Sequence, residues 1–405
     1  QHPHGQVPAY EWSFGDTNPP VHAWAAWQVY QLDKRRTGIG DHLFLAQSYS
    51  AVTLDVMWWL NQKDDENRGV FGGGFLGMDN IGVFDRDQPL PTGGTLDQAD
   101  GTAWMATLVL QMLEITVELS HSDPGYLRMF GRWVWDGWLI ANALEKGAGN
   151  VSFWNDEIGF YNDVIEFPEG TATPLEVFSM QAVVPLFACI SIPATAVEAL
   201  ASINTEITRL RAAYKVPDGA TKLRLSGGDG SHVMVAIVEQ ERLATMLKRL
   251  LDPDQFLSPH GLRSLSKYHE DHPYVYHVEG QDYSVSYMPA ESRNRMFGGN
   301  SNWRGPIWMP MNFLFVQALN SYARFLGDTF TVTDPVGSGT QVTLGVVADH
   351  MAARLAGLVV RGEDGRRAVF GDNDYFQADP HWRDLVPFHE YFDGDDGHGV
   401  GASHQ

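Results

Sequence analysis

The stretch from residue 101 to residue 120, GTAWMATLVLQMLEITVELS, constrains the fold more than any other part of the chain. Its composition predicts a helix that is apolar on nearly every face. Such a helix is not suited to a surface, so we expect other elements to surround it inside a barrel or bundle. Residues 122–144 also have helical composition, and only a short Ser-Asp-Pro-Gly break separates the two stretches. We therefore expect two antiparallel neighbouring helices.

Most of the remaining chain predicts helices that are joined by loops rich in Gly, Pro and Asp. A stripe of apolar residues in 41–62 predicts a helix with Asp41 as its N-cap. Strand-forming residues gather at 274–280 and 329–335. Further helices are expected at 21–36, 174–190, 193–214, 236–251, 306–326 and 342–360. With about nine helices, no fixed-period repeat and no linker, residues 1–405 are interpreted as one all-α domain of paired helices.

The excess of acidic residues disfavours negatively charged partners. The chain has 50 acidic and 28 basic residues, a net charge of -22, which repels phosphate backbones and anionic lipids. We therefore expect neither a nucleic acid nor a membrane as partner, whereas a neutral substrate is compatible with this charge. The single cysteine, Cys189, allows no internal disulfide and favours a reducing, cytoplasmic location. No uninterrupted apolar run reaches the roughly 20 residues of a membrane span.

Both ends of the chain have an unusual composition. It begins with Gln1 in QHPHGQVPAYEW, which is typical of sequence inside a domain, and it stops at GVGASHQ without a helix end or a polar tail. We expect this chain to be a piece of a longer protein.

Three long loops, 64–97, 252–302 and 372–405, carry most of the residues suited to chemistry. Each is longer than a connection between helices needs, which is typical of functional loops. Together they contain acids, aromatic residues, and Asn, Gln and Arg. Carboxylates supply acid–base chemistry, aromatic faces pack on sugar rings, and amide and guanidinium groups bind hydroxyls. This combination favours a carbohydrate site.

The first loop holds Asp79 in FGGGFLGMDNIGVFDRD, a Gly-rich stretch with apolar neighbours. An Asp in such a place often closes a turn or caps a helix, and on chemistry alone we favour this structural role. Asp85 and Asp87 of the same loop remain unassigned. The GGGFLG stretch is not a dinucleotide-binding loop, because no strand precedes it and no helix follows directly.

The segment 297–313, FGGNSNWRGPIWMPMNF, places Asn302, Trp303, Arg304 and Trp308 shortly before a helix. Arg304 offers a fork of donors to a carboxylate or to sugar hydroxyls. An arginine that ties the loop to the helix end is the alternative, and the sequence does not decide between them.

The segment 388–399, FHEYFDGDDGHG, contains Glu390, which is either a base at the end of a helix or an ordinary surface residue. Asp393, Asp395 and Asp396 follow it. They lack the regular alternation of ligands in a calcium-binding loop, so we expect no metal here.

Taken together, these stretches resemble the catalytic domain of glycoside hydrolase family 63, in particular its bacterial glucosidase-like proteins. The resemblance runs nearly end to end and is carried by PAYEWSFGDTNPPVHAWA, GGGFLGMDNIGVFDRD, LDQADGTAWMA, FLSPHGLRSLSKYH, FGGNSNWRGPIW and DPHWRDLVPFHEYFDGDDGHGVGASHQ. It implies an (α/α)6 toroid barrel, shared with the trehalases, and hydrolysis of α-linked sugars with inversion. Relatives have further helices beyond both ends, so about nine of the twelve barrel helices are expected here, and the isolated piece is expected to expose apolar faces.

The resemblance also implies roles for individual residues. Asp79 in LGMDN matches the family's general acid, with Asp100 in QADGTAW as the reserve candidate, although a helix start suits an N-cap equally well. Glu390 in FHEYF matches the general base, which precedes the last helix in the family. The NWRGPIW segment matches a motif of the substrate cleft. The expected substrate-binding residues are Trp303, Arg304, Trp308, Asn302, Asp100, Trp104 and Tyr391.

The expected reaction is one-step hydrolysis of a disaccharide or oligosaccharide, without a metal or cofactor. Asp79 gives its proton to the glycosidic oxygen and Glu390 activates a water, which requires the carboxyls to be roughly 6.5–9.5 Å apart. Apolar contact with Phe75, Leu76 and Met78 is expected to keep Asp79 protonated. The alternatives are a trehalase-like or mannosylglycerate-hydrolase-like activity, or a non-catalytic sugar-binding barrel.

Overall fold

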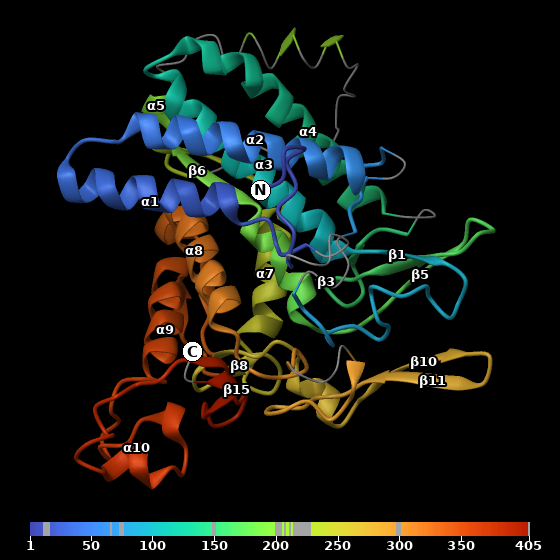
Figure 1. Ribbon diagram of the computed structural model, residues 1–405, viewed down its shortest axis with the longest axis vertical. Coiled ribbons are helices and arrows are strands. Elements are labelled where there is room, and N and C mark those ends of the chain that lie inside the picture. The colour runs from blue at the N-terminus through green and yellow to red at the C-terminus, as the bar shows by residue number, and fades with distance from the viewer. Residues whose placement is uncertain are drawn as a thin grey trace.

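The computed structural model (Figure 1) describes residues 1–10, 17–64, 67–72, 77–147, 151–198, 205, 208–209, 212–213, 228–296 and 301–403. Within these residues the protein is rich in helices, with short strands between them, as the sequence predicts in outline. Long helices occupy the upper part of Figure 1, and the strands and loops that carry the candidate site lie below them and to one side.

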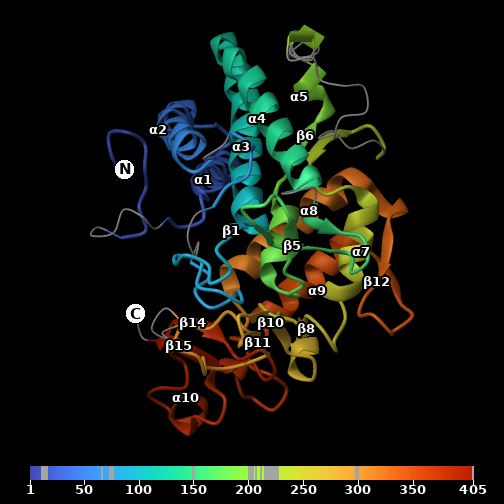
Figure 2. The same cartoon turned by 90° about the vertical axis from the view of Figure 1, so that its right-hand side faces the viewer.

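Helix α3 (Ala99–Ser120) runs through the centre of the helical part, and every residue in it except Glu114 and Glu118 is buried. Its length and hydropathy would suit a membrane span, but 89% of its most apolar window is covered by the rest of the fold. The prediction of an inner helix surrounded by other elements is therefore confirmed. Helix α4 (Leu127–Lys146) follows after the turn η1 (Pro124–Tyr126) and lies beside α3 (Figure 2).

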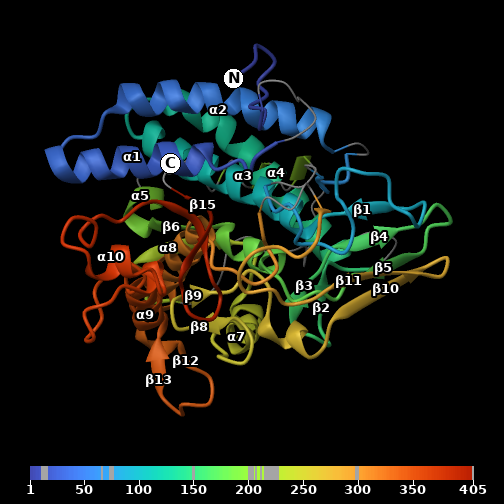
Figure 3. The same ribbon diagram turned by 60° about the horizontal axis from the view of Figure 1, so that its bottom comes forward.

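Helices α1 (His22–Thr37) and α2 (His42–Gln62) pack across α3 as a second pair (Figure 3). The Asp41 side chain accepts a hydrogen bond from the Phe44 amide, which confirms the predicted N-cap of α2. The Glu118 carboxylate of α3 accepts hydrogen bonds from Tyr30 and Lys34 of α1. Glu118, one of the two residues of α3 that are not fully buried, thus fixes α1 against the inner helix.

The second half of the chain contributes α5 (Ala194–Glu198), α7 (Gln240–Leu250), α8 (Met309–Leu326), α9 (Leu344–Ala356) and α10 (Asp374–Ala378). Helices α8 and α9 lie side by side (Figures 1 and 2). Short 3-10 turns complete the helical elements: η2 (Met180–Phe187), η3 (Lys267–Glu270), η5 (Gly327–Thr329) and η6 (Ala368–Phe370). The helices predicted at 236–251, 306–326 and 342–360 are thus present, each somewhat shorter than predicted.

The strands of the described residues form small antiparallel sheets. One sheet has three strands in the order β1–β4–β5, and the others are pairs. The strands are β1 (Thr95–Asp97), β2 (Trp154–Asn155), β3 (Phe160–Tyr161), β4 (Val164–Glu166), β5 (Ala172–Pro174), β6 (Cys189–Pro193), β7 (His232–Ala236), β8 (Leu257–Ser258), β9 (Gly261–Leu262), β10 (Tyr274–Val278), β11 (Gln281–Val285), β12 (Thr331–Thr333), β13 (Gln341–Thr343), β14 (His389–Phe392) and β15 (Gly399–Ser403). The strands predicted at 274–280 and 329–335 are confirmed as β10 and β12.

The helix predicted at 174–190 is wrong. Pro185 has no amide hydrogen for a regular helix, and this segment forms the 3-10 turn η2 followed by strand β6. Strand β6 pairs with β7, and Cys189 at its start is buried. Burial raises the pKa of the Cys189 thiol to about 12, which fits a packing role. The helix predicted at 193–214 begins as α5, and most of the rest of it lies outside the described residues.

A small hydrophobic core separate from the main one supports the loop that carries Asp79. Val83 and Phe84 of this loop pack with Ile165 of β4 and with aromatic residues of the β10–β11 pair, such as Tyr276. Figures 1 and 3 show the β10–β11 pair extending alongside the β1–β4–β5 sheet. Two segments from distant parts of the chain therefore form one platform for the candidate site.

Candidate active site

Asp79 lies in a turn, and its Oδ2 accepts a hydrogen bond of 2.6 Å from the Ser301 hydroxyl. Burial raises the pKa of this carboxyl, while the Ser301 hydroxyl and the Asp79 backbone amide act in the opposite direction. Met78 beside it is buried, as predicted. Phe75 and Leu76, which were also expected to desolvate Asp79, lie outside the described residues. The raised pKa agrees with the requirement for a proton donor.

The Asn80 side chain joins the Asp79 loop (residues 77–94) to the segment that follows Ser301. Asn80 Oδ1 accepts a 2.6 Å hydrogen bond from the Trp303 amide, and its Nδ2 donates to Asn302 Oδ1 at 3.2 Å. Asn302 in turn donates to the carbonyls of Met288 and Ala290. Asn80 and Asn302 are both fully buried, so these bonds are shielded from water. Asn302 is thus a core residue of the site, and its contacts are with protein groups.

The Arg304 guanidinium is buried and donates to three backbone carbonyls: Asn80 at 2.6 Å, Gly82 at 2.9 Å and Ser284 at 3.0 Å. Burial lowers its pKa to about 10, because the surrounding partners are neutral carbonyls. These contacts favour the structural alternative for Arg304, in which it ties loops together, over a direct contact with a sugar.

Three aromatic rings, here called the ring stack, link this segment to the end of the chain. Trp303 and Trp308 are parallel with centroids 3.8 Å apart, and Tyr391 continues the stack at 4.8 Å from Trp308. Helix α8 begins at Met309, so Trp308 is its N-cap residue. All three rings are at least nine-tenths buried, and Trp303 Nε1 has no hydrogen-bond partner among the described residues. The stack thus brings together Trp303, Trp308 and Tyr391, which were expected to bind substrate. Most of their surface contacts other protein groups.

Glu390 lies in strand β14, so of the two alternatives left open by the sequence, the one that places it at the end of a helix does not hold. A bulge interrupts the pairing with β15 between His389 and Tyr391, and Glu390 Oε2 accepts a 3.1 Å hydrogen bond from the Ala402 amide of β15. Glu390 is only partly buried, which leaves its carboxylate access to solvent. The β14–β15 hairpin thus presents this carboxylate next to the ring stack.

The sequence reasoning missed Glu291. Its Oε2 accepts a 2.8 Å hydrogen bond from the Tyr391 hydroxyl, and its Oε1 accepts one of 3.0 Å from the Gly401 amide. Burial, followed by this hydrogen bond, raises the pKa of Tyr391. Glu291 therefore lies in the same cluster as Glu390 and holds both strands of the hairpin. The one sequence feature that could have pointed to Glu291 is its position in the second long loop, 252–302.

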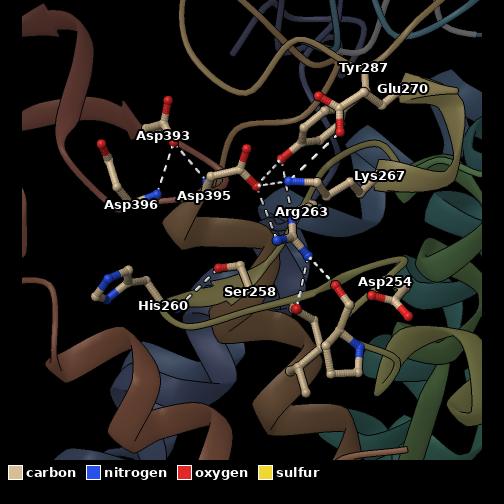
Figure 4. A network of polar contacts seen from close by, with 12 residues as sticks. Asp254, Ser258, His260, Arg263, Lys267, Glu270, Tyr287, Asp393, Asp395 and Asp396 are labelled. Carbon is tan, nitrogen blue, oxygen red and sulfur yellow. Dashed lines mark hydrogen bonds and ion pairs between the residues drawn. The ribbon is translucent and has the colours of Figure 1, made fainter.

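A second network fixes the turn of this hairpin (Figure 4). Asp395 Oδ1 accepts hydrogen bonds from Arg263 at 3.2 Å, Lys267 at 3.0 Å and Tyr287 at 3.1 Å. Burial acts to raise the pKa of Asp395, but these donors outweigh burial and the pKa is lowered. Because Arg263 is itself buried and bound to nearby carbonyls, the turn is attached to a rigid part of the fold.

The other acids of this turn close it by backbone contacts. Asp393 Oδ1 accepts the amides of Asp395 and Asp396, and the Asp396 carboxylate contacts His398 Nδ1 at 2.6 Å. Asp393, Asp396 and His398 each have a ligand-type atom within 4.8 Å of the others. Because hydrogen bonds within the turn account for this grouping, we infer no metal from it.

Asp100 is in the first turn of α3, behind Gln98 as the N-cap, and is fully buried. Both of its oxygens contact the Arg86 guanidinium, and Asp163 lies 3.6 Å from the same group. This ion-paired position does not suit a proton donor. Trp104 is also buried, against Phe187, so neither Asp100 nor Trp104 reaches an open cleft in the described residues.

A cavity of about 710 Å³ has none of the carboxyls of Asp79, Glu291 and Glu390 in its lining. It lies between the end of α2, strand β1 and the β4–β5 turn, and its charged lining residues are Lys63, Asp64, Arg68, Asp97 and Glu166. Arg68 forms ion pairs across it with Glu166 and Asp97. The candidate site is therefore identified by its carboxyls and aromatic rings and not by a cavity.

Comparison with known proteins gives two family matches. The model described as the glycosyl hydrolase family 63 C-terminal domain matches residues 232–334. The model described as the mannosylglycerate hydrolase MGH1-like glycoside hydrolase domain matches residues 1–86. The first match contains Ser301 and the ring-stack tryptophans, and the second contains Asp79.

One curated protein is similar along the whole chain. The uncharacterized protein YMR196W of Saccharomyces cerevisiae is 42% identical over 419 residues, a region that covers 100% of this chain. This chain spans 38% of the length of that relative.

Two solved structures share the fold. The GH63 mannosylglycerate hydrolase from Thermus thermophilus in complex with glucose has a TM-score of 0.52 at 14% identity, and the match covers 99% of this chain and 82% of the hydrolase. The same hydrolase in complex with Tris and D-glycerate has a TM-score of 0.50 at 15% identity, with the same coverage. At these identities the likeness concerns the fold alone.

Proposed function

We propose that the protein is a member of glycoside hydrolase family 63 and hydrolyses α-glycosidic bonds with inversion, with Asp79 as acid and Glu390 as base. The matches of residues 232–334 and 1–86 to two glycoside hydrolase models support this proposal. The observation that carries the proposal is a chain of contacts from Asp79 to Glu390. Asn80, next to Asp79, accepts the Trp303 amide, and Trp303 stacks through Trp308 on Tyr391, which adjoins Glu390. The pKa of Asp79 is raised by burial, and Glu390 is partly exposed on the hairpin beside the ring stack. Inverting glycosidases need such a pair, with one carboxyl protonated and the other ionised.

In this mechanism Asp79 donates its proton to the glycosidic oxygen as the bond to the leaving sugar breaks. Glu390 takes a proton from a water that attacks the anomeric carbon from the opposite face. The backbone amide of Ala402 donates to Glu390 Oε2 at 3.1 Å and so holds the proposed base in place. The ring stack links the segment after Ser301 to the β14–β15 hairpin, and the small exposed parts of Trp303 and Trp308 would supply the sugar contact.

We further propose that the described helices are part of an (α/α)6 toroid. The inner helix α3 with its partner α4, the pair α1 and α2, and the pair α8 and α9 have the antiparallel pairing that such a toroid needs. The Asp79 loop and the β14–β15 hairpin then lie at one end of this toroid.

Two classes of sugar substrate are considered. A mannosylglycerate-hydrolase-like activity is favoured as the alternative by the match of residues 1–86, which includes Asp79, to the MGH1-like domain. An α-glucoside and an α-mannoside with an acidic aglycone therefore form the two arms of a substrate screen with the full-length protein.

Leaving-group chemistry separates the two catalytic roles. Asp79→Asn is expected to lower kcat about 10²–10⁴-fold on an α-glycoside with a sugar leaving group, because that oxygen needs a proton. The same variant retains most of its activity on a glycosyl fluoride, since fluoride departs without general acid catalysis. Glu390→Gln is expected to lose activity on both substrates, because both require an activated water.

Product stereochemistry tests inversion. Proton NMR of the first turnovers is expected to show the β-anomer released from an α-linked substrate. If the α-anomer appears first, inversion is wrong. If Asp79→Asn keeps wild-type turnover on the sugar leaving group, the acid assignment is wrong.

A further inference from the structure

The two oxygens of the Asp79 carboxyl have different surroundings. Oδ2 accepts the 2.6 Å hydrogen bond from the Ser301 hydroxyl. The influences on this carboxyl are burial, the Ser301 hydroxyl and the backbone amide of Asp79 itself. Ser301 is therefore the side chain that distinguishes one oxygen of Asp79 from the other.

The position of Ser301 is fixed by its neighbours along the chain. The Asn302 side chain donates to two backbone carbonyls, at 2.8 and 2.6 Å, and the Trp303 amide donates to Asn80. Arg304 then holds the backbone of residues 80 and 82 from the same segment. Ser301 is itself 6% exposed. Its hydroxyl thus sits on a segment that is hydrogen-bonded to residues 80 and 82, directly after Asp79.

We propose that Ser301 is a positioning residue for the acid: by occupying Oδ2 it places the catalytic proton of Asp79 on Oδ1, the oxygen that faces the glycosidic bond. This inference rests on the proposed function. A protonated carboxyl has one donor, and a proton on Oδ2 would be given to Ser301 instead of to the substrate. The Ser301 bond therefore sets both the direction of proton delivery and the ease with which Asp79 ionises.

The opposing influences on Asp79 make this role measurable. Burial alone favours the neutral carboxyl, and the Ser301 bond favours the charged one. Removing the hydroxyl should therefore make Asp79 hold its proton to higher pH, while loss of orientation lowers the rate. A residue that only supports the fold would lower activity without moving the pH dependence.

The test compares Ser301→Ala, Ser301→Thr and Ser292→Ala in the full-length protein. Ser292 is the matched control, because its hydroxyl contacts the Asn80 side chain at 3.2 Å and belongs to the same network without contacting the acid. For Ser301→Ala we expect a lower kcat and an alkaline limb of the pH profile displaced to higher pH. The activity of each protein is expressed as a fraction of its own maximum. At a pH well above the midpoint of the alkaline limb, this fraction should be about ten times larger in Ser301→Ala than in wild type, the size expected for a hydrogen bond to a charged group. Ser301→Thr, which keeps the hydroxyl, restores the wild-type limb, and Ser292→Ala leaves the limb in place.

A titration without substrate separates this inference from the proposed function. The ionisation of Asp79 is followed by carbon NMR of labelled aspartate, assigned with Asp79→Asn. A rise of its midpoint in Ser301→Ala but not in Ser292→Ala supports the role of Ser301, even if no glycoside is hydrolysed and the proposed function fails. An unchanged midpoint in Ser301→Ala, or an equal rise in Ser292→Ala, overturns the inference.

Discussion

At the level of single residues, Asp79 combines a partly buried carboxyl with only partial compensation of its charge. Its pKa in the folded protein lies above the value in the unfolded chain. The unfolded state therefore ionises more readily, and stability is lost as the pH rises through the folded pKa of Asp79. The chemistry proposed for this residue thus opposes the stability of the fold near neutral pH.

Asp79→Asn should accordingly be at least as stable as wild type near pH 7. Asparagine is uncharged and its side-chain oxygen still accepts the Ser301 bond. The difference in melting temperature is expected to shrink as the pH falls below the ordinary value of an aspartate, 3.8, where the wild-type carboxyl is protonated in both states. Thermal unfolding across pH 3–8 measures it, and a variant less stable than wild type at pH 7 would contradict this argument.

Arg304→Lys tests the three-carbonyl contact. Lysine lacks the planar fork and cannot reach all three oxygens, so the variant is expected to lose about 3 kcal/mol in the free energy of unfolding. Arg366→Lys is the control, because Arg366 is largely exposed and its ion pairs with Asp372 and Asp374 are long. That change should cost less than about 1 kcal/mol. Urea unfolding compares the two, and equal losses would refute the role of Arg304.

At the level of elements, the β14–β15 hairpin shows how a segment without helical signals supports Glu390, the proposed base. The bulge beside Glu390, the Glu291 contacts and the Asp395 network act on different parts of the same hairpin. Gly401 has a φ of 70°, and a Cβ there would lie 2.5 Å from the Tyr391 ring and 3.0 Å from Glu390. The hairpin geometry therefore depends on glycine at this position.

Gly401→Ala is expected to displace the Tyr391 ring and Glu390 and to reduce kcat more than about tenfold, the loss that a misplaced catalytic group causes. Gly280→Ala is a matched control: Gly280 has a φ of 82° in the β10–β11 turn, and a Cβ there would meet nothing within 4 Å. Both variants bear the backbone strain of about 1–2 kcal/mol. Only Gly401→Ala adds the steric overlap, so tryptophan fluorescence and kcat should change in that variant alone. Equal effects of the two changes would exclude the steric explanation.

The sequence predicts an element correctly when the contacts that form it lie close together along the chain, and fails when they join distant residues. The Asp41 cap and the apolar surface of residues 101–120 are local signals, and both predicted their elements correctly. Strand β6 depends on its pairing with β7, which begins only at His232, and a local reading gave a helix instead. The position of Glu390 in a strand is likewise set by the distant contacts of the hairpin.

The candidate site also contains residues that the sequence indicates and residues that only distant contacts reveal. Asp79 and Glu390 were selected through the family resemblance, and the structure joins their surroundings through the ring stack. Glu291 and Ser301 were not selected, because a single Glu or Ser in a loop carries no pattern. Their roles depend on contacts with residues 100 or more positions away, which no local spacing reports.

At the level of the whole molecule, a buried ion network connects the inner helix to the candidate site. Arg86, in the Asp79 loop, is held between Asp100 of α3 and Asp163 just before β4. Burial raises the pKa of Asp163 to about 6, with Arg86 acting against that rise. Since Asp163 also accepts the Ala99 amide and the Gln181 side chain, helix, loop and sheet meet at this point.

Asp100→Asn is expected to destabilise the whole fold by about 3–5 kcal/mol, because it removes one partner of a buried charge and leaves Arg86 poorly compensated. Asp384→Asn is the control, since Asp384 pairs with Arg361 while largely exposed, and its loss should leave the stability nearly unchanged. Chemical denaturation of both variants measures the difference. A loss below about 1 kcal/mol for Asp100→Asn would show that the network does not hold the fold together.

The contacts around Asp79 also set an order of events during synthesis. The bonds from Ser301 to Asp79 and from Arg304 to Gly82 join positions 222 residues apart. A ribosome adding roughly 5–20 residues per second needs on the order of 10–45 s to cover that interval. Throughout this time the nascent loop lacks its partners, while the local helical pairs before it can already form. The proton donor is thus assembled late, so a chain released before residue 304 should have helices but no catalytic competence.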